Sequence, residues 1–275
     1  MPSWCFLLKN NYKSMRSKPY SIVSPPFDLL SGGIRVMYGL YGALLAKGQV
    51  AFLNAKYEAT DFIAVYPEIY YGNPMEAKTV VRYLLNKPGL FGGPTSFSPE
   101  EKIFVFSKIY DTLGVDDDHL LFLPILNLHL FRDKKEKRTN RGVYIGKGRD
   151  IPLKETEGLP RITRELSSDQ NKLADFLNTC EVMYSFENPT AMNEIARLCG
   201  CKVCYLTEGA TIKYTKEELE EKYEPGMEGV YFGIDEYEGS TEKFDSDSFR
   251  ERYLGLRKTF EEKIDLFISL TQDSS

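Results

Sequence analysis

Apolar residues along the chain occur in two alternating patterns, which are short continuous runs and positions at helical spacing. Short apolar runs bounded by turn residues predict buried strands, because strands inside a parallel sheet are covered on both faces. Between such runs, Ile34, Tyr38 and Leu45 keep helical spacing and predict a helix over 34–47. The stretch MEAKTVVRYLLN (75–86) follows Pro74, which favours a helix start, so a second helix is expected there. The expected strands of this first half are 20–24, 49–54, 61–68, 103–110 and 120–126.

The second half continues the alternation after a polar stretch of mixed charge at 132–141. No core can form in that stretch, so it is the expected linker. The final helix is long and amphipathic, with Phe249, Tyr253 and Phe260 at helical spacing. The expected elements are strands at 142–150 (ending in a glycine and basic loop), 160–164, 181–185, 202–206 and 229–235, and helices at 169–178, 190–199 and 247–270.

Strands that alternate with helices predict an α/β fold built on parallel sheets. The pattern divides into two Rossmann-like domains, 1–130 and 131–275, on either side of the linker. Ligands of such sheets bind where strands end and helices begin, so the expected site is a cleft between the domains. The final helix is expected to pack back across that cleft.

Composition limits the classes of protein that fit. The 275 residues carry a formal net charge of −5, which argues against a chain that binds nucleic acid by charge as a whole. A basic cluster at 134–138 leaves a local phosphate contact open. No stretch reaches the roughly 20 apolar residues of a membrane span, and the first residues make a poor signal peptide. A cytoplasmic protein without a transmembrane segment is therefore expected.

Cysteines and acidic residues do not predict a metal site. The five cysteines include Cys201 and Cys204 in a C-x-x-C, but no second pair follows and the chain has two histidines. Buried thiols are the expected outcome. The run Asp116 to Asp118 follows Gly114 in a polar turn, and solvated charges are expected there.

Two stretches in the first half place candidate chemistry at strand ends. Ser31, Gly32 and Gly33 precede the helix over 34–47, where free N–H groups suit an anion, although a tight turn alone also explains the glycines. Glu68 ends the strand over 61–68 next to a loop rich in tyrosine. Its carboxylate is a candidate general base or sugar ligand, and a capping or solvated glutamate is the alternative.

Two stretches in the second half suit a nucleoside diphosphate. Lys147 and Arg149 lie in the loop GKGR, and Arg164 follows the next strand, so three cations are expected to converge unless they are only solvated charges. Thr190 is expected to cap the helix over 190–199 and to offer N–H groups to phosphate. Glu194, one turn later, can accept hydrogen bonds from a ribose diol, or else lies on an exposed helix face.

These motifs together resemble a known family. SGGIRVMYGLYGALLAKGQ, YPEIYYGNPMEAKTVVRYLLNKPGLFGG, YIGKG, ITRE and NPTAMNEIARLCGCKV are similar to motifs of bacterial and phage glycosyltransferases of the GT-B type, related to glycosyltransferase families one and four. The last motif is the most specific of these. The resemblance spans 20–206 and implies two Rossmann-like domains that face each other across a cleft.

The resemblance also implies roles for individual residues. Glu194 matches the family's glutamate that holds the donor ribose, and Thr190 falls among its phosphate-binding groups. Glu187 matches the partner glutamate loosely, because it lies seven residues before Glu194 instead of eight. Asn188 belongs to the same donor-binding motif. The other matches are Lys147, Arg149 or Arg164 for the cations at the diphosphate, and Gly32 and Gly33 for the first-domain glycine loop.

The implied activity is transfer of a sugar from a nucleotide sugar, most simply a UDP- or GDP-sugar, to a hydroxyl acceptor. The first domain is expected to bind the acceptor and the second the donor, with no metal and no further cofactor. Glycan or polysaccharide synthesis is the expected setting. The alternatives are a phage enzyme acting on a hydroxymethylated DNA base, an inactive nucleotide-sugar-binding module, and an oxidoreductase, although the GxGxxG fingerprint of the last is missing.

Overall fold

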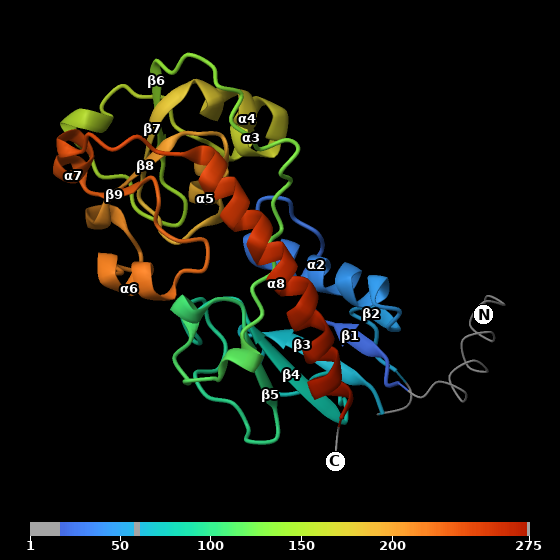
Figure 1. The fold of residues 1–275 in the computed structure, drawn as a ribbon. Coiled ribbons are helices and arrows are strands. Elements are labelled where there is room, and N and C mark those ends of the chain that lie inside the picture. Colours follow the sequence, from blue (N-terminus) through green and yellow to red (C-terminus); the bar gives the residue numbers. More distant parts are fainter. Residues whose placement is uncertain (1–16, 58–60, 274–275) are drawn as a thin grey trace.

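The computed structural model describes residues 17–57 and 61–273, so the N-terminal residues 1–16, with Cys5 and the candidate signal segment, lie outside the described part. Within it, strands form two sheets (Figure 1), one in the order β2-β1-β3-β4-β5 and the other in the order β6-β7-β8-β9. Every pairing between these strands is parallel. The predicted α/β class with parallel sheets is confirmed.

The first sheet carries one long crossover helix. Helix α2 (Gly32–Ala46) joins the first two strands and buries Val36, Met37, Leu40 and Leu44 against the sheet. The central strand β3 is buried at every position, as its unbroken apolar sequence predicts. The five strands are β1 (Tyr20–Ile22), β2 (Ala51–Leu53), β3 (Ile63–Pro67), β4 (Thr79–Leu84) and β5 (Lys102–Val105).

Two predicted elements of this half are wrong. Residues 79–84 form strand β4 and not a helix, because the sheet needs a strand between β3 and β5 and the residues Thr79, Val80 and Val81 suit one. The predicted strand at 120–126 is reduced to one bridge between Leu120 and Val105. Two 3₁₀ turns, η2 (Lys108–Tyr110) and η3 (Asp117–His119), lie between β5 and this bridge.

The second sheet has helices between most of its strands. Thr163, Asp169, Thr190, Thr215 and Asp245 cap five of these helices through their side chains, as such residues do at helix starts. The elements are β6 (Asn140–Tyr144), η4 (Lys154–Thr156), α3 (Arg164–Ser168), α4 (Gln170–Thr179), β7 (Cys180–Ser185), α5 (Ala191–Leu198), β8 (Lys202–Tyr205), η5 (Thr207–Gly209), α6 (Lys216–Lys222), β9 (Val230–Phe232), α7 (Ile234–Gly239) and α8 (Ser246–Gln272).

The expected linker at 132–141 is hydrogen-bonded to the elements around the second sheet. Arg138 donates hydrogen bonds to the carbonyl oxygens of Leu177, Asn178, Cys180 and Cys199. It also pairs with Asp133 at 2.6 Å. Since these bonds satisfy carbonyls at the ends of α4 and α5, this polar segment belongs structurally to the second sheet.

Helix α8 contacts the cores of both sheets (Figure 1). Its first turns place Phe249 and Tyr253 in the cluster beside the second sheet. Its last turns place Phe260, Ile264 and Phe267 in the cluster beside the first. No helix within residues 17–57 and 61–273 has an apolar stretch long enough to span a membrane.

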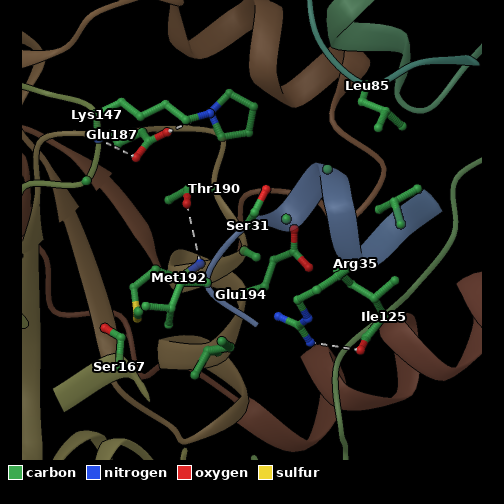
Figure 2. A pocket seen from close by; sticks show the side chains of 18 of the residues that line it. Ser31, Arg35, Leu85, Ile125, Lys147, Ser167, Glu187, Thr190, Met192 and Glu194 are labelled. Atoms are coloured by element: carbon green, nitrogen blue, oxygen red, sulfur yellow. Dashed lines mark hydrogen bonds and ion pairs between the residues drawn. The ribbon is translucent and has the colours of Figure 1, made fainter. Parts of the chain in front are cut away.

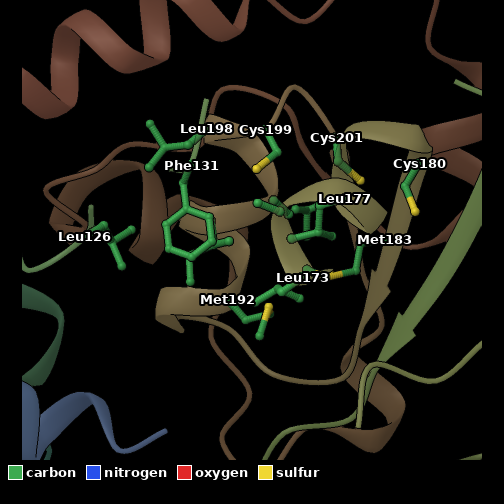
Figure 3. Packing of buried hydrophobic residues seen from close by; sticks show 14 of the residues in the cluster. Leu126, Phe131, Leu173, Leu177, Cys180, Met183, Met192, Leu198, Cys199 and Cys201 are labelled. Carbon is green, nitrogen blue, oxygen red and sulfur yellow. The ribbon is translucent and has the colours of Figure 1, made fainter. Parts of the chain in front are cut away.

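Four cysteines are free and buried, as the sequence predicts. Cys180, Cys199 and Cys201 lie among Leu177, Phe131 and other apolar side chains at the second sheet (Figure 3). Asp116, Asp117 and Asp118 are exposed, and Asp116 caps η3, so this acidic run is a surface turn.

Candidate functional site

A cavity of about 540 Å³ lies between the two sheets, and segments that follow their strands line it (Figure 2). Its size is in the range of pockets that hold small molecules and cofactors. The first sheet contributes the start of α2 and residues that follow β4 and β5, while the second contributes the loop after β6 and the start of α5. Ligand binding at the carboxyl ends of parallel strands is the rule for this class of sheet.

The N-terminus of α2 forms one wall. Ser31 is the N-cap, and its side chain accepts a hydrogen bond from the backbone N–H of Ile34 at 3.4 Å. Gly32 and Gly33 begin the helix and line the cavity. The remaining N–H groups of this first turn have no partner within the helix, so they can donate to an anion.

The N-terminus of α5 forms the opposite wall. Thr190 is the N-cap, and its hydroxyl accepts a hydrogen bond from the N–H of Met192 at 3.5 Å, as the sequence predicts. Thr190, Ala191 and Met192 all line the cavity. Two helix N-termini from the two sheets therefore meet in one cavity, and both favour negative charge.

Glu194 is buried in this cavity with 7% of its surface exposed, so the alternative of an exposed helix face is wrong. The Tyr223 hydroxyl donates to its Oε1 at 2.6 Å. Burial raises the pKa of Glu194, while hydrogen bonds from Tyr223 and Tyr253 and the charge of Arg197 oppose the rise. A carboxylate has about four acceptor positions, so capacity for ligand hydroxyls remains.

Sequence reasoning missed three groups around this carboxylate. Arg35 of α2 lines the cavity near Glu194 and donates to the Ile125 carbonyl at 3.1 Å (Figure 2). Tyr223 and Tyr253 come from the end of α6 and from α8. In the sequence, Tyr253 belongs to the apolar face of the final helix. A buried tyrosine hydroxyl usually needs a hydrogen-bond partner, and this is the one sequence signal that could have pointed to the site.

Lys147 lines the cavity in the loop after β6, and Glu187 fixes this loop (Figure 2). The Lys147 N–H donates to Glu187 Oε2 at 2.9 Å, and its ammonium lies 4.0 Å from Oε1. Burial raises the pKa of Glu187, and its contacts with Lys147 lower it. Gly146 has a φ of 57°, which favours glycine, and a Cβ there would lie 1.9 Å from Glu187 Oε2, so a side chain at this position would displace the Glu187 carboxylate.

Of the three cations that the sequence predicts to converge, Lys147 and Arg164 line the same cavity, and Arg149 does not. Arg164 begins α3 and lines the cavity. It pairs with Asp28 at 2.9 Å, and this ion pair joins the start of α3 to the segment between β1 and α2. The exposed Arg149 is outside both cavities; its backbone N–H donates to the Gly209 carbonyl at 2.8 Å.

Glu68 is not a lining residue of the cavity. Its buried carboxylate accepts a hydrogen bond from the Leu85 N–H at 2.9 Å, and burial raises its pKa. Because Leu85 and Asn86 line the cavity, Glu68 supports the wall from behind. Asn188 is buried and lies instead beside a second, smaller cavity.

Comparisons with known proteins give no family. No protein-family model matches the chain, and no curated protein matches it. A functionally uncharacterised protein from Klebsiella pneumoniae is similar in structure at a TM-score of 0.43 and 10% identity, over 80% of this chain and 94% of that one. A Listeria monocytogenes protein to which UDP-N-acetylglucosamine 2-epimerase function is ascribed is similar at a TM-score of 0.29 and 12% identity, over 88% of this chain and 75% of that one. Neither similarity is close enough to define a function.

Proposed function

We propose that this protein is a glycosyltransferase of the GT-B arrangement that transfers a sugar from a nucleotide sugar to a hydroxyl acceptor. The observation that carries the proposal is the shared cavity, in which two helix N-termini, Lys147 and the buried Glu194 meet. Cations and N–H groups suit a diphosphate, and a buried carboxylate suits a ribose diol. The region 131–275 acts as donor domain and 1–130 as acceptor domain in this proposal.

The donor is oriented by α5. Glu194 accepts hydrogen bonds from the ribose hydroxyls, and the diphosphate lies at the start of the helix near Thr190. As the glycosidic bond breaks, negative charge grows on the leaving diphosphate. Lys147 and the N–H groups of Gly32 and Gly33 stabilise that charge, which is how a site accelerates such a step through its side chains.

Glu68 is a positioning residue in this proposal. Its carboxylate holds the Leu85 N–H and so fixes a wall of the acceptor side. Arg149, which lies outside both cavities, has no role at the diphosphate. A bound UDP- or GDP-sugar is a substrate here, and the proposal needs no further cofactor.

A glycan or another small hydroxyl acceptor fits better than a hydroxymethylated DNA base. Of the basic cluster at 134–138, Lys134 pairs with Asp175 at 2.5 Å, and Lys135 pairs with Asp247 at 2.9 Å. Arg138 is held by Asp133. Three of the four cations of this cluster are thus paired within the chain, so the cluster gives the DNA-modifying alternative no specific support.

A thermal-shift series with UDP-, GDP-, CMP- and dTDP-sugars tests the proposal. A ligand that binds only the native state at 100 times its Kd adds about 2.7 kcal/mol of stability, so the matching nucleotide sugar should raise Tm clearly. Stabilisation by NAD(P) and by no nucleotide sugar would overturn the proposal. Tight donor binding without transfer or donor hydrolysis would identify an inactive binding module instead.

A further inference from the structure

Arg35 differs from the other cations of the large cavity between the two sheets, because it has no ion pair in the described part of the chain. The cationic side chains that line this cavity belong to Arg35, Lys147 and Arg164. Arg164 pairs with Asp28 at 2.9 Å, and the Lys147 ammonium lies 4.0 Å from the Glu187 carboxylate. The one hydrogen bond of the Arg35 side chain to these described residues goes to a neutral carbonyl oxygen. A partly buried cation is stabilised by a counter-charge, so a ligand can supply the one that Arg35 lacks.

The Arg35 side chain extends from α2 into the space beside Glu194 (Figure 2). Its Nη2 donates to the Ile125 carbonyl oxygen at 3.1 Å, which fixes one corner of the guanidinium. Nε and Nη1 have no hydrogen-bond partner among the described residues, and neither atom is sealed from solvent. The guanidinium therefore keeps N–H groups for a ligand that enters the cavity.

Glu194 is the acidic side chain that acts on Arg35, but other groups already stabilise its carboxylate. Burial lowers the pKa of Arg35, and the nearby Tyr253 and Glu194 oppose that decrease. The Glu194 carboxylate accepts hydrogen bonds from Tyr223 and Tyr253, and the fully buried Arg197 lies nearer to it in charge effect than Arg35 does. Glu194 therefore leaves much of the charge of Arg35 uncompensated.

Glu224, the other carboxylate close to Glu194, does not compensate Arg35 either. Burial raises the pKa of Glu224, and the charge of Glu194 adds to the rise. Its two oxygens accept hydrogen bonds from the Ser107 hydroxyl at 2.5 Å and from the Lys108 N–H at 2.7 Å. Glu224 is not among the groups that shift the pKa of Arg35.

The position of Arg35 in α2 brings it close to the free N–H groups of the first turn. Ser31 is the N-cap, so Gly32 and Gly33 carry N–H groups without a partner inside the helix. Arg35 follows Ser31 by four residues and Gly32 by three, and both spacings place residues on one helix face. All of these residues line the cavity. The helix N-terminus and the guanidinium thus favour negative charge in the same place.

We propose that Arg35 binds the diphosphate of the donor from the first half, so that the two halves hold this group between them. The inference rests on the proposed function and adds a residue to it. The diphosphate is the part of a nucleotide sugar that is negatively charged in every such donor, so it is the part that matches a cation without a counter-charge. A guanidinium forms charge-assisted hydrogen bonds with phosphate oxygens, frequently two at once.

Ligands with and without phosphate test the inference. Calorimetric titration gives the affinities of UDP and GDP, and competition against the bound one gives the affinity of the matching nucleoside. Arg35→Gln removes the charge, so it should weaken the nucleoside diphosphate at least about tenfold, because hydrogen bonds between charged groups are the stronger ones. The nucleoside should lose less than about twofold, since it has no phosphate. Equal losses for the two ligands, or no loss for the diphosphate, would overturn the inference.

Arg250→Gln is the matched control. Arg250 of α8 donates to the Leu128 carbonyl oxygen at 2.6 Å, in the same connecting segment as Ile125, and it lines neither cavity. This control should keep both affinities, and a similar selective loss there would overturn the inference. Arg35→Lys keeps the charge and should lose less diphosphate affinity than Arg35→Gln. Equal losses in the two Arg35 variants would show that the bond to Ile125 matters and the charge does not.

Inorganic diphosphate distinguishes a failure of this inference from a failure of the proposed function. The unaltered protein should bind it, and Arg35→Gln should bind it at least about tenfold more weakly. If that holds but no nucleotide sugar binds, the proposed function falls and Arg35 remains a diphosphate ligand. If nucleotide sugars bind and Arg35→Gln keeps the full affinity for the nucleoside diphosphate, only this inference falls. Binding of neither inorganic diphosphate nor any nucleotide would overturn both.

Discussion

At the scale of single residues, Glu194 determines how the donor would be held. Glu194→Gln keeps the size of the side chain and an oxygen for Tyr223, but it removes the negative charge. Affinity for the matching nucleoside diphosphate should fall at least about tenfold, since hydrogen bonds to charged groups are the stronger ones. Calorimetric titration measures this, and a 2′-deoxyribose analogue should bind the unaltered protein more weakly. Equal affinity of Glu194→Gln and the unaltered protein would remove Glu194 from the site.

Tyr223 adjusts the protonation of the same carboxylate. Burial holds the pKa of Glu194 above its usual value, and the hydrogen bond from Tyr223 limits that rise. Protonated Glu194 loses its negative charge, so nucleotide affinity should decrease as pH falls through this raised pKa. Tyr223→Phe removes the bond and raises the pKa further, which should shift the acidic loss of affinity to higher pH.

The affinity for one nucleotide is measured against pH for the unaltered protein and for Tyr223→Phe. Because the ligand is the same, its own titration affects both profiles equally and cancels in their comparison. Tyr83→Phe is a suitable control, because the Tyr83 hydroxyl donates to the Leu121 carbonyl at 2.6 Å and neither residue lines the cavity. The control should keep the unaltered profile. Identical profiles for Tyr223→Phe and the unaltered protein would contradict the effect of Tyr223 on the pKa of Glu194.

At the scale of elements, α8 links the two sheets, because its side chains enter both cores. Phe267 is fully buried and stacks near Tyr20 and Phe104, with ring centres 6.2 Å and 4.6 Å away. Phe267→Ala should cost about 3 to 5 kcal/mol of unfolding free energy, since it removes a large buried side chain and leaves a cavity. Denaturant unfolding measures the loss.

Leu254 offers the matched control on the same helix. It is 38% exposed, and Leu254→Ala should change stability by less than about 0.5 kcal/mol. Alanine is the stronger helix former at both positions, so lost helix propensity cannot explain a decrease in stability. A comparable loss for both variants would contradict the assignment of this stability to burial of Phe267 against the first sheet.

At the scale of the whole molecule, α8 should make the two sheets unfold together. The helix loses its partners in one cluster whenever the other sheet opens, so partial unfolding exposes apolar surface in both halves. Hydrogen exchange should therefore give the amides of β3 and β7 similar opening free energies. Phe267→Ala should lower both by similar amounts, and a decrease confined to β3 would show two independent units.

Patterns among neighbouring residues were enough to predict the fold class and several residues of the site. Apolar runs and helical spacing gave the parallel α/β class, and local capping chemistry gave Thr190 as the start of α5. The candidates Gly32, Gly33, Lys147, Arg164, Glu187, Thr190 and Glu194 do line one cavity. Their positions at strand ends predicted this, because parallel strands direct their carboxyl ends to one edge.

Contacts between residues far apart in the chain account for what these patterns could not predict. Residues 79–84 are a strand because β3 and β5 flank them, and no local pattern contains that pairing. Glu194 is buried, and its carboxylate accepts hydrogen bonds from Tyr223 and Tyr253, which come from the end of α6 and from α8. The Glu68 carboxylate instead accepts a hydrogen bond from the Leu85 N–H. The periodicity of the sequence predicts the element to which a polar residue belongs. Its role also depends on its burial and its hydrogen-bond partners, and these are properties of the packed molecule.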